Sequence, residues 1–189
     1  MPLPELTVPR YTMTLPSNGK SVSYRPFLVK EEKILHIAME SDSLDSIMIA
    51  LEQIVNNCIE ENIDLQNTPM FDLEYMLLQI RSKSIGEIVK PVITCNKCQE
   101  NSEISMDINK AKIIGEVKGD DENKIQINEE IGIVMSYPTM SSVTKSLNRA
   151  GGKMGEDSVV EDLVYSITDN MKYIYDSNEV YNCKECSDE

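Results

Sequence analysis

The sequence predicts an α+β domain that is mainly helical, with an N-terminal β-hairpin and a small antiparallel β module that carries a Cys-x-x-Cys knuckle. Three observations predict this class. Apolar residues between positions 44 and 59 recur at spacings of three and four, as on a helix with one buried stripe. An Asn-Gly pair separates two strand-like runs near the N-terminus. Between residues 88 and 109 the apolar period changes to two, around Cys95 and Cys98.

The size of the chain allows one compact domain. At 189 residues, with 41% hydrophobic and 26% charged residues, it is large enough to bury a core. Within this domain we expect an N-terminal arm and hairpin (1–26), a helical part (27–84), a β module (85–137) and a C-terminal helical part (138–189). The eleven methionines suit an irregular core, and also an adaptable interface.

The charge balance excludes several classes of partner. A net charge of −14 argues against nucleic acid and against anionic membranes, because both are bound through Lys and Arg. A basic protein partner is compatible with it, as is a solvated acidic surface. No apolar run approaches the roughly 18 residues of a membrane span, and the N-terminus lacks the order of a signal peptide. We therefore expect a reducing cytoplasm, where five cysteines are free thiols or metal ligands.

The first elements along the chain are an extended arm and a hairpin. Residues 1–10 contain three prolines and show no periodicity. The strand-like runs 11–15 and 20–24 flank the Asn-Gly pair, and a type I′ turn accepts this pair because it needs positive φ at both central residues. An isolated hairpin is only marginally stable, so we expect it to pack on the helices that follow.

Two helices joined by a polar segment at Ser41–Ser43 come next. The first spans about Lys30–Met39 and contains the single histidine, His36, which we expect to be packed or at the surface. The second has Ser43 as its N-cap and an acidic residue in its first turn, where the helix dipole favours it. Its apolar stripe consists of Leu44, Ile47, Met48, Leu51, Ile54, Val55, Cys58 and Ile59.

A third helix and then the β module follow. Thr68 as the cap and Pro69 at the first helical position predict a helix that continues to about Lys83. The module has the order strand, Cys-x-x-Cys, strand, with Pro91 suited to an edge strand. Residues 124–127 and 131–137 predict two more strands, of which the second is apolar enough to be buried.

The C-terminal part is predicted to be helical. Residues 142–149 form a short helix, 150–155 a glycine-rich break, and Ser158 with Glu161 a capping box that opens the last helix. The apolar stripe of this helix consists of Val160, Leu163, Val164, Ile167, Met171 and Ile174.

The cysteines are the most chemical feature of the sequence. Cys95 and Cys98 have the spacing at which two thiolates reach one tetrahedral zinc ion. Cys183 and Cys186 have the same spacing and would complete a four-cysteine structural zinc site if the fold brought the pairs together. Unligated thiols, or metal on one pair, are the alternatives. A thioredoxin-like redox pair is disfavoured because it would open a helix, whereas this pair lies in a hairpin.

One stretch resembles a known family. The run Tyr24–Lys33, preceded by the Leu15–Lys20 turn and followed by Ala38–Ser41, is similar to the T4-type phage baseplate hub subunit family. The resemblance covers most of the chain and implies a role in a contractile tail, with no catalytic residues. Members of the family tend to run on past the position of Glu189, which favours a longer form. The candidate partner-binding residues in this stretch are Arg25, Phe27, Leu28, Lys30, Glu31 and Lys33.

The function expected from this resemblance is non-enzymatic. The chain would be a structural or assembly subunit of the baseplate hub, made in the host cytoplasm and contacting other tail proteins in the virion. The alternative is a transient chaperone for the tail hub or the tape-measure protein, absent from the mature virion. No GxSxG, HExxH or GxGxxG motif points to an enzyme, and no small-molecule substrate is expected.

Overall fold

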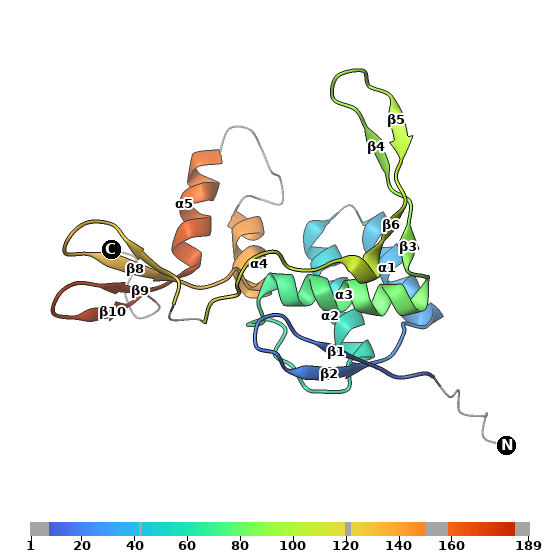
Figure 1. Ribbon diagram of the computed structural model, residues 1–189, viewed down its shortest axis with the longest axis horizontal. Coiled ribbons are helices and arrows are strands. Elements are labelled where there is room, and N and C mark those ends of the chain that lie inside the picture. The colour runs from blue at the N-terminus through green and yellow to red at the C-terminus, as the bar shows by residue number, and fades with distance from the viewer. Residues whose placement is uncertain (1–7, 42, 120–121, 150–158, 184–189) are drawn as a thin grey trace.

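The computed structural model describes residues 8–41, 43–119, 122–149 and 159–183 (Figure 1). Helices are combined with several small antiparallel sheets, which confirms the α+β class. The helical body carries the N-terminal hairpin on one side. It consists of β1 (Tyr11–Thr14), β2 (Ser21–Tyr24), α1 (Val29–Glu40), α2 (Leu44–Cys58) and α3 (Met70–Ser84).

The predicted hairpin is confirmed, but its predicted two-residue turn is wrong. Strands β1 and β2 pair in antiparallel register, and the turn is closed by Leu15 N–H, which donates to the Lys20 carbonyl at 2.8 Å. Of the Asn-Gly pair only Gly19 has positive φ, at +68°, so the turn is wider than type I′. The physical reason lies in α3. Asp72 accepts hydrogen bonds from the Ser17 N–H and hydroxyl and holds the turn open against this helix.

The core lies where the hairpin meets α2 and α3. Fully buried side chains from the three elements pack together, among them Val22, Tyr24, Val55, Leu73 and Met76. The predicted stripe of α2 is buried in its second half, where Cys58 is 1% exposed as expected for a core residue, whereas Leu44 in the first turn is 42% exposed. Ser43 caps α2 as predicted, accepting the Ser46 N–H at 3.4 Å.

Helix α3 begins differently from the prediction. Pro69 is the N-cap and the helix starts at Met70, so Thr68 is not the cap. The Thr68 hydroxyl instead donates to the Asp64 carbonyl at 2.7 Å, within the preceding turn. The Met70 N–H donates to the Pro138 carbonyl at 2.8 Å, so a segment distant in the chain satisfies the first N–H of the helix.

The predicted strand, Cys-x-x-Cys, strand order is confirmed, and it forms a projecting ribbon (residues 88–107). In it β3 (Ile88–Val89) pairs with β6 (Met106–Asp107), and β4 (Val92–Thr94) pairs with β5 (Asn101–Glu103). Figure 1 shows the ribbon extending away from the helices, with the β4–β5 turn at its outer end. The chain returns to the body at a short 3₁₀ helix, Ile108–Lys110, where Ile108 is buried beside α3.

The remaining elements form a C-terminal lobe (residues 122–149 and 159–183). Its sheet has the order β10-β9-β8-β7 and joins strands from both sides of residue 137. Val134 of β8 is buried, in line with the sequence. The elements are β7 (Lys124–Gln126), β8 (Gly132–Met135), α4 (Met140–Arg149), α5 (Val159–Asp169), β9 (Met171–Tyr175) and β10 (Val180–Asn182).

The prediction that the last helix continues through Met171 and Ile174 is wrong. Helix α5 ends at Asp169, and both residues lie in strand β9. Asn170 marks the change, because its side chain donates to the Ser166 carbonyl and its own carbonyl accepts the Ser136 N–H at 2.8 Å. Pairing with β8 and β10 on either side then satisfies the backbone of β9.

Two parts of this C-terminal prediction lie outside the described residues. They are the glycine-rich break at 150–155 and Ser158, the expected cap of the last helix. The short helix expected at 142–149 is present and begins two residues earlier, at Met140. Thr139 precedes it, and the Thr139 and Ser142 side chains each accept the backbone N–H of the other residue, at 3.3 and 3.0 Å. This reciprocal capping explains the earlier start.

Candidate functional site

The stretch that carries the family resemblance is built around a buried ion pair. Glu31 in the first turn of α1 is fully buried, and its carboxylate lies 3.0 Å from the guanidinium of Arg25, which follows β2. The same carboxylate accepts the Leu28 N–H at 2.8 Å. This is the bond of a capping box in which the side chain of the third helical residue accepts the N–H of the N-cap residue. Arg25 also donates to the Asn57 carbonyl at the end of α2. The pair therefore ties the hairpin, α1 and α2 together.

The surroundings of Glu31 keep it ionised. Burial by itself raises the pKa of its carboxyl group, but the hydrogen bonds from Arg25 and the Leu28 backbone, with the charge of Arg25, outweigh it and leave the pKa below 4.5. The buried group is therefore a paired charge in the folded protein at neutral pH, which is the condition for burying a carboxylate without a large penalty.

The six candidate partner-binding residues are divided by the fold. Arg25 and Glu31 are committed to the internal pair, and Leu28 supplies the helix N-cap. Lys30 lies 3.3 Å from the Glu31 carboxylate with its side chain 65% exposed. Lys33 is exposed on α1, and half-buried Phe27 lines a groove. The side chains of Phe27, Lys30 and Lys33 are accessible to a partner protein. That these three residues bind a partner remains a prediction.

The groove beside Phe27 is apolar and lies between the three helices of the body. It has a volume of about 200 Å³ and is walled by Leu35 of α1, Leu51 of α2 and Leu77 of α3, with further apolar residues from the same helices. Glu32 and Arg81 are its charged lining residues apart from buried Glu31. The sequence analysis did not predict this site. One signal was available, because two adjacent leucines on α3, Leu77 and Leu78, widen the apolar surface of the helix beyond a single buried stripe.

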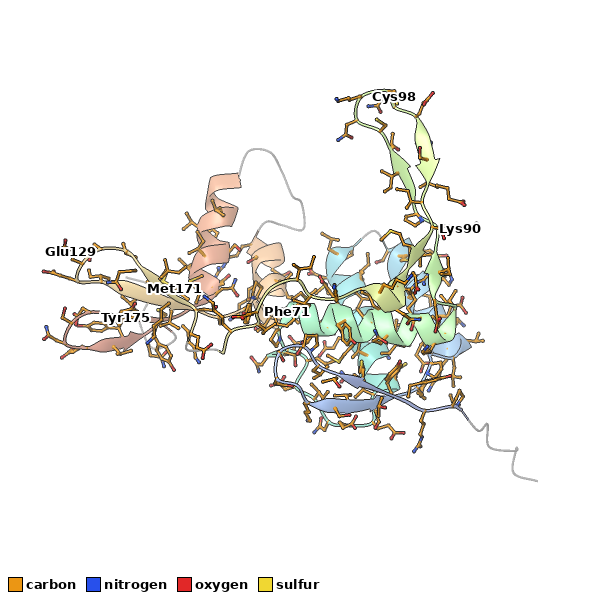
Figure 2. The ribbon with its side chains drawn as sticks, in the orientation of Figure 1. Phe71, Lys90, Cys98, Glu129, Met171 and Tyr175 are labelled. Carbon is orange, nitrogen blue, oxygen red and sulfur yellow. The ribbon has the colours of Figure 1, made fainter. Side chains whose placement is uncertain are left out.

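The second feature is the cysteine pair at the outer end of the ribbon. Cys95 and Cys98 are exposed and not joined by a disulfide. Figure 2 shows Cys98 at the outer end of the ribbon. Backbone N–H groups of Cys98 and Lys97 donate to the Cys95 sulfur, and these bonds lower the pKa of the Cys95 thiol below 9. The Cys98 thiol lies 3.8 Å from the Glu100 carboxylate. Buried Cys58 differs, because burial raises its pKa to about 11.

The structure places Cys183 far from the first predicted cysteine pair, Cys95 and Cys98. Cys183 directly follows β10, and Figure 1 shows this strand and the ribbon tip at opposite ends of the molecule. Cys186 lies outside the described residues. Among the residues that are described, no group of three or more His, Cys, Asp or Glu could hold a metal ion. A zinc site that uses all four cysteines thus remains a prediction.

A polar cleft separates the helical body from the C-terminal lobe. It has a volume of about 690 Å³, and its walls include the hairpin turn at Ser17-Asn18, Tyr137 and Asn170. Its lysines are Lys118, Lys145 and Lys172, and its acid, Asp169, is paired with Arg149 at 2.7 Å. An edge-to-face contact between Phe71 and Tyr137, 5.1 Å between ring centroids, packs the lobe against α3 beside this cleft.

Large apolar side chains are uncovered on the ribbon and on α5. Val92, Ile93, Ile104 and Met106 of the ribbon are 43–63% exposed. On α5 the residues Leu163, Val164 and Ile167 of the predicted stripe are 43–59% exposed, so these side chains are not part of the core. Monomeric soluble proteins seldom expose apolar residues in such groups, which is a sign of protein–protein contact.

A projecting ribbon, an uncovered helix face and an apolar groove are features typical of a protein that contacts other chains. The particular assembly follows from sequence comparison. A family model described as T4 bacteriophage base plate protein matches residues 8–189, and the chain belongs to this family. Comparisons with curated proteins and with solved structures find no significant match.

Family membership agrees with the resemblance seen at Tyr24–Lys33. It associates the chain with the baseplate of a phage tail and with other baseplate proteins, and it carries no indication of catalysis. No helix in the described part of the chain has the length and apolar composition of a membrane span.

Proposed function

We propose that the chain is a non-enzymatic structural subunit of the baseplate hub, retained in the virion and acting through protein–protein contacts. The observation that carries this proposal is the ribbon. Its apolar residues Val92, Ile93 and Ile104 are 43–63% exposed along an element that extends away from its own body.

A free ribbon of this kind is poorly stabilised by itself. A two-stranded antiparallel unit is at best marginally stable in water without a third strand or a covering surface. The ribbon here is held by backbone pairing and by surface ion pairs such as Lys90–Glu103 at 3.2 Å, which contribute less than about 1 kcal/mol. Burial against a neighbouring subunit would supply the missing stabilisation, so the ribbon fits a permanent contact.

The groove between α1, α2 and α3 supports a second contact of the same kind. It is apolar, of a size for one or two side chains, and its lining includes Phe27 from the family-like stretch. An apolar side chain from another tail protein would fill it. The net charge of −14 further favours partners with a basic face, because charge complementarity raises association rates and suppresses wrong pairings.

The test is a ribbon variant with its apolar contacts removed and its fold retained. Val92→Lys with Ile104→Lys removes two exposed apolar side chains, and the new lysine at 92 lies opposite Glu103 in the ladder, which preserves pairing. Ser105→Lys, at an exposed position of the same ribbon, is the matched control. Phages carrying each gene are purified and their particles analysed by mass spectrometry.

We expect wild-type and Ser105→Lys chains in the particles, and loss of the double-variant chain together with failed tail assembly. In a different outcome, the chain is required for assembly and yet is absent from wild-type particles. That result would overturn the proposal of a virion subunit and would support the alternative, a transient chaperone for the hub or the tape-measure protein. Normal incorporation of the double variant would show that the ribbon is not the contact.

A further inference from the structure

The polar cleft between the helical body and the C-terminal lobe has walls that are fixed by hydrogen bonds. On the body side, the Ser17 N–H donates to the Asp72 carboxylate at 3.0 Å and holds the hairpin turn on α3. On the lobe side, the Lys118 N–H donates to the Tyr137 hydroxyl at 3.0 Å. The volume of the cleft, about 690 Å³, is within the range of roughly 300–1,000 Å³ that is usual for ligand pockets. The cleft is therefore a preformed site for a short ligand.

The cleft differs in charge from the chain as a whole, which has 32 acidic and 18 basic residues. The cations that line the cleft are Lys118, Lys145 and Lys172. Its acid, Asp169, lies 2.7 Å from the guanidinium of Arg149. At the edge, the Glu122 carboxylate accepts the Gly119 N–H at 3.2 Å, and the aspartates at 120 and 121 lie outside the described residues. With Arg149 and Glu122 included, four described cations face two described acids.

Hydrogen-bond donors remain available in the cleft. None of the ion pairs among the described residues involves Lys118 or Lys145. The side-chain oxygens of Tyr137 and Asn18 already accept the backbone N–H groups of Lys118 and Lys20, at 3.0 and 2.9 Å. The Tyr137 O–H and the Asn18 amide N–H groups are thus left to donate. An ionised carboxylate, which only accepts hydrogen bonds, matches these donors and the lysine ammonium groups.

We propose that this cleft binds an acidic segment of a partner protein, whose Asp or Glu side chains are bound by Lys118 and Lys145. The existence of a partner rests on the proposed function, because a baseplate subunit contacts other tail proteins. The cleft adds a contact of the opposite charge. The acidic remainder of the surface favours basic partners, whereas the cleft favours an acidic segment and disfavours a basic one.

Protein carboxylates fit this cleft better than the phosphates of a nucleic acid. Nucleic-acid binding depends on many Lys and Arg side chains along the path of the phosphate backbone. A nucleic acid that extended beyond the cleft would meet the surface of a chain with a net charge of −14, which repels a polyanion. A short acidic segment of a protein needs only the local positive charge of the cleft, and the volume of the cleft suits such a segment.

The experiment measures peptide binding by the full purified chain, so its result does not depend on whether the chain is retained in the virion. The probe is a dye-labelled peptide of alternating Glu and Ser residues, and the control peptide has Gln in place of each Glu. Binding is followed by fluorescence anisotropy at low and at physiological salt. Lys118→Glu with Lys145→Glu reverses two charges in the cleft. Lys97→Glu with Lys112→Glu, at exposed positions outside the cleft, makes the same change in net charge and is the matched control.

We expect the Glu peptide to bind the wild type, more weakly as salt screens the charges, and the Gln peptide not to bind. The cleft variant should bind the Glu peptide at least about tenfold more weakly, and the control variant less than about twofold more weakly. Equal melting temperatures show that both variants are folded.

Three results would overturn the proposal. The first is a wild-type chain that does not bind the Glu peptide even at low salt. The second is an equal loss of binding in the two variants, which would assign the binding to overall charge and not to the cleft. The third is tighter binding of a single-stranded oligothymidylate that the cleft variant loses, which would assign the cleft to nucleic acid. Absence of the chain from virions would disprove the proposed function and leave the peptide result unchanged.

Discussion

The fully buried carboxylate of Glu31 lies 3.0 Å from the guanidinium of Arg25, whose side chain is 20% exposed. Arg25 also donates to the Asn57 carbonyl in the last turn of α2, so its guanidinium joins the hairpin, α1 and α2. Removing Arg25 would leave a buried carboxylate without its main partner. We expect Arg25→Ala to lower the free energy of unfolding by roughly 3 kcal/mol, measured by urea denaturation.

The chain offers a matched control for this pair. Lys30 lies 3.3 Å from the same carboxylate, but its side chain is 65% exposed. Lys30→Ala should therefore cost less than about 1 kcal/mol. Equal losses in the two variants would contradict a structural role that is specific to Arg25.

Acid should destabilise the protein through Glu31. The pKa of this group is lowered in the folded state, so its stabilisation is complete above the unfolded-state pKa of about 4.5 and is lost as the pH falls through the lower folded-state pKa. We expect the melting temperature of the wild type to fall more steeply below pH 4.5 than that of Glu31→Gln, in which this titration is absent. Parallel curves would show that Glu31 does not contribute.

Asp72 should be the attachment point of the hairpin turn. It is fully buried and accepts the Ser17 N–H at 3.0 Å and the Ser17 hydroxyl. Asp72→Ala leaves these donors without their acceptor, and we expect a loss of about 1–3 kcal/mol in urea denaturation. Glu74→Ala, at an exposed position two residues on, should cost far less. The idea fails if the two variants are equally stable.

The cysteines should differ in reactivity. Burial raises the pKa of Cys58 to about 11, so its thiol is protonated at neutral pH, whereas Cys95 is exposed and its pKa is lowered. In protein treated with a chelator, iodoacetamide should modify Cys95 at least roughly 100-fold faster than Cys58, as read by peptide mass spectrometry. Similar rates in the native protein would mean that Cys58 is not in the core.

The uncovered face of α5 should matter little for folding. Leu163→Ser with Ile167→Ser changes side chains that are 59% and 43% exposed, and each should alter the unfolding free energy by about 0.5 kcal/mol or less. Leu73→Ala, at a fully buried site of α3, should cost about 2–5 kcal/mol. A large loss in the α5 variant would show that this face packs inside the isolated chain.

Features with a local signature could be predicted from the sequence. The period of α2, the hairpin around Gly19 and the strand, Cys-x-x-Cys, strand order of the ribbon each depend on neighbouring residues, and all three are present. The buried Cys58 follows from its place on an apolar stripe. The candidate groove beside Phe27 had only a weak signal, since three separate helices contribute its walls.

By itself, the sequence determined the α+β class, most of the helices and strands, and the resemblance at Tyr24–Lys33 that family membership confirms. Only the tertiary structure decided that α5 ends at Asp169, that Glu31 is buried, and that the ribbon cysteines lie far from the strand before Cys183. The physical reason is the same in each case. Contacts between segments distant in the chain, such as the β8–β9 pairing and the Arg25–Glu31 pair, outweigh local preference and leave no periodic pattern in the sequence.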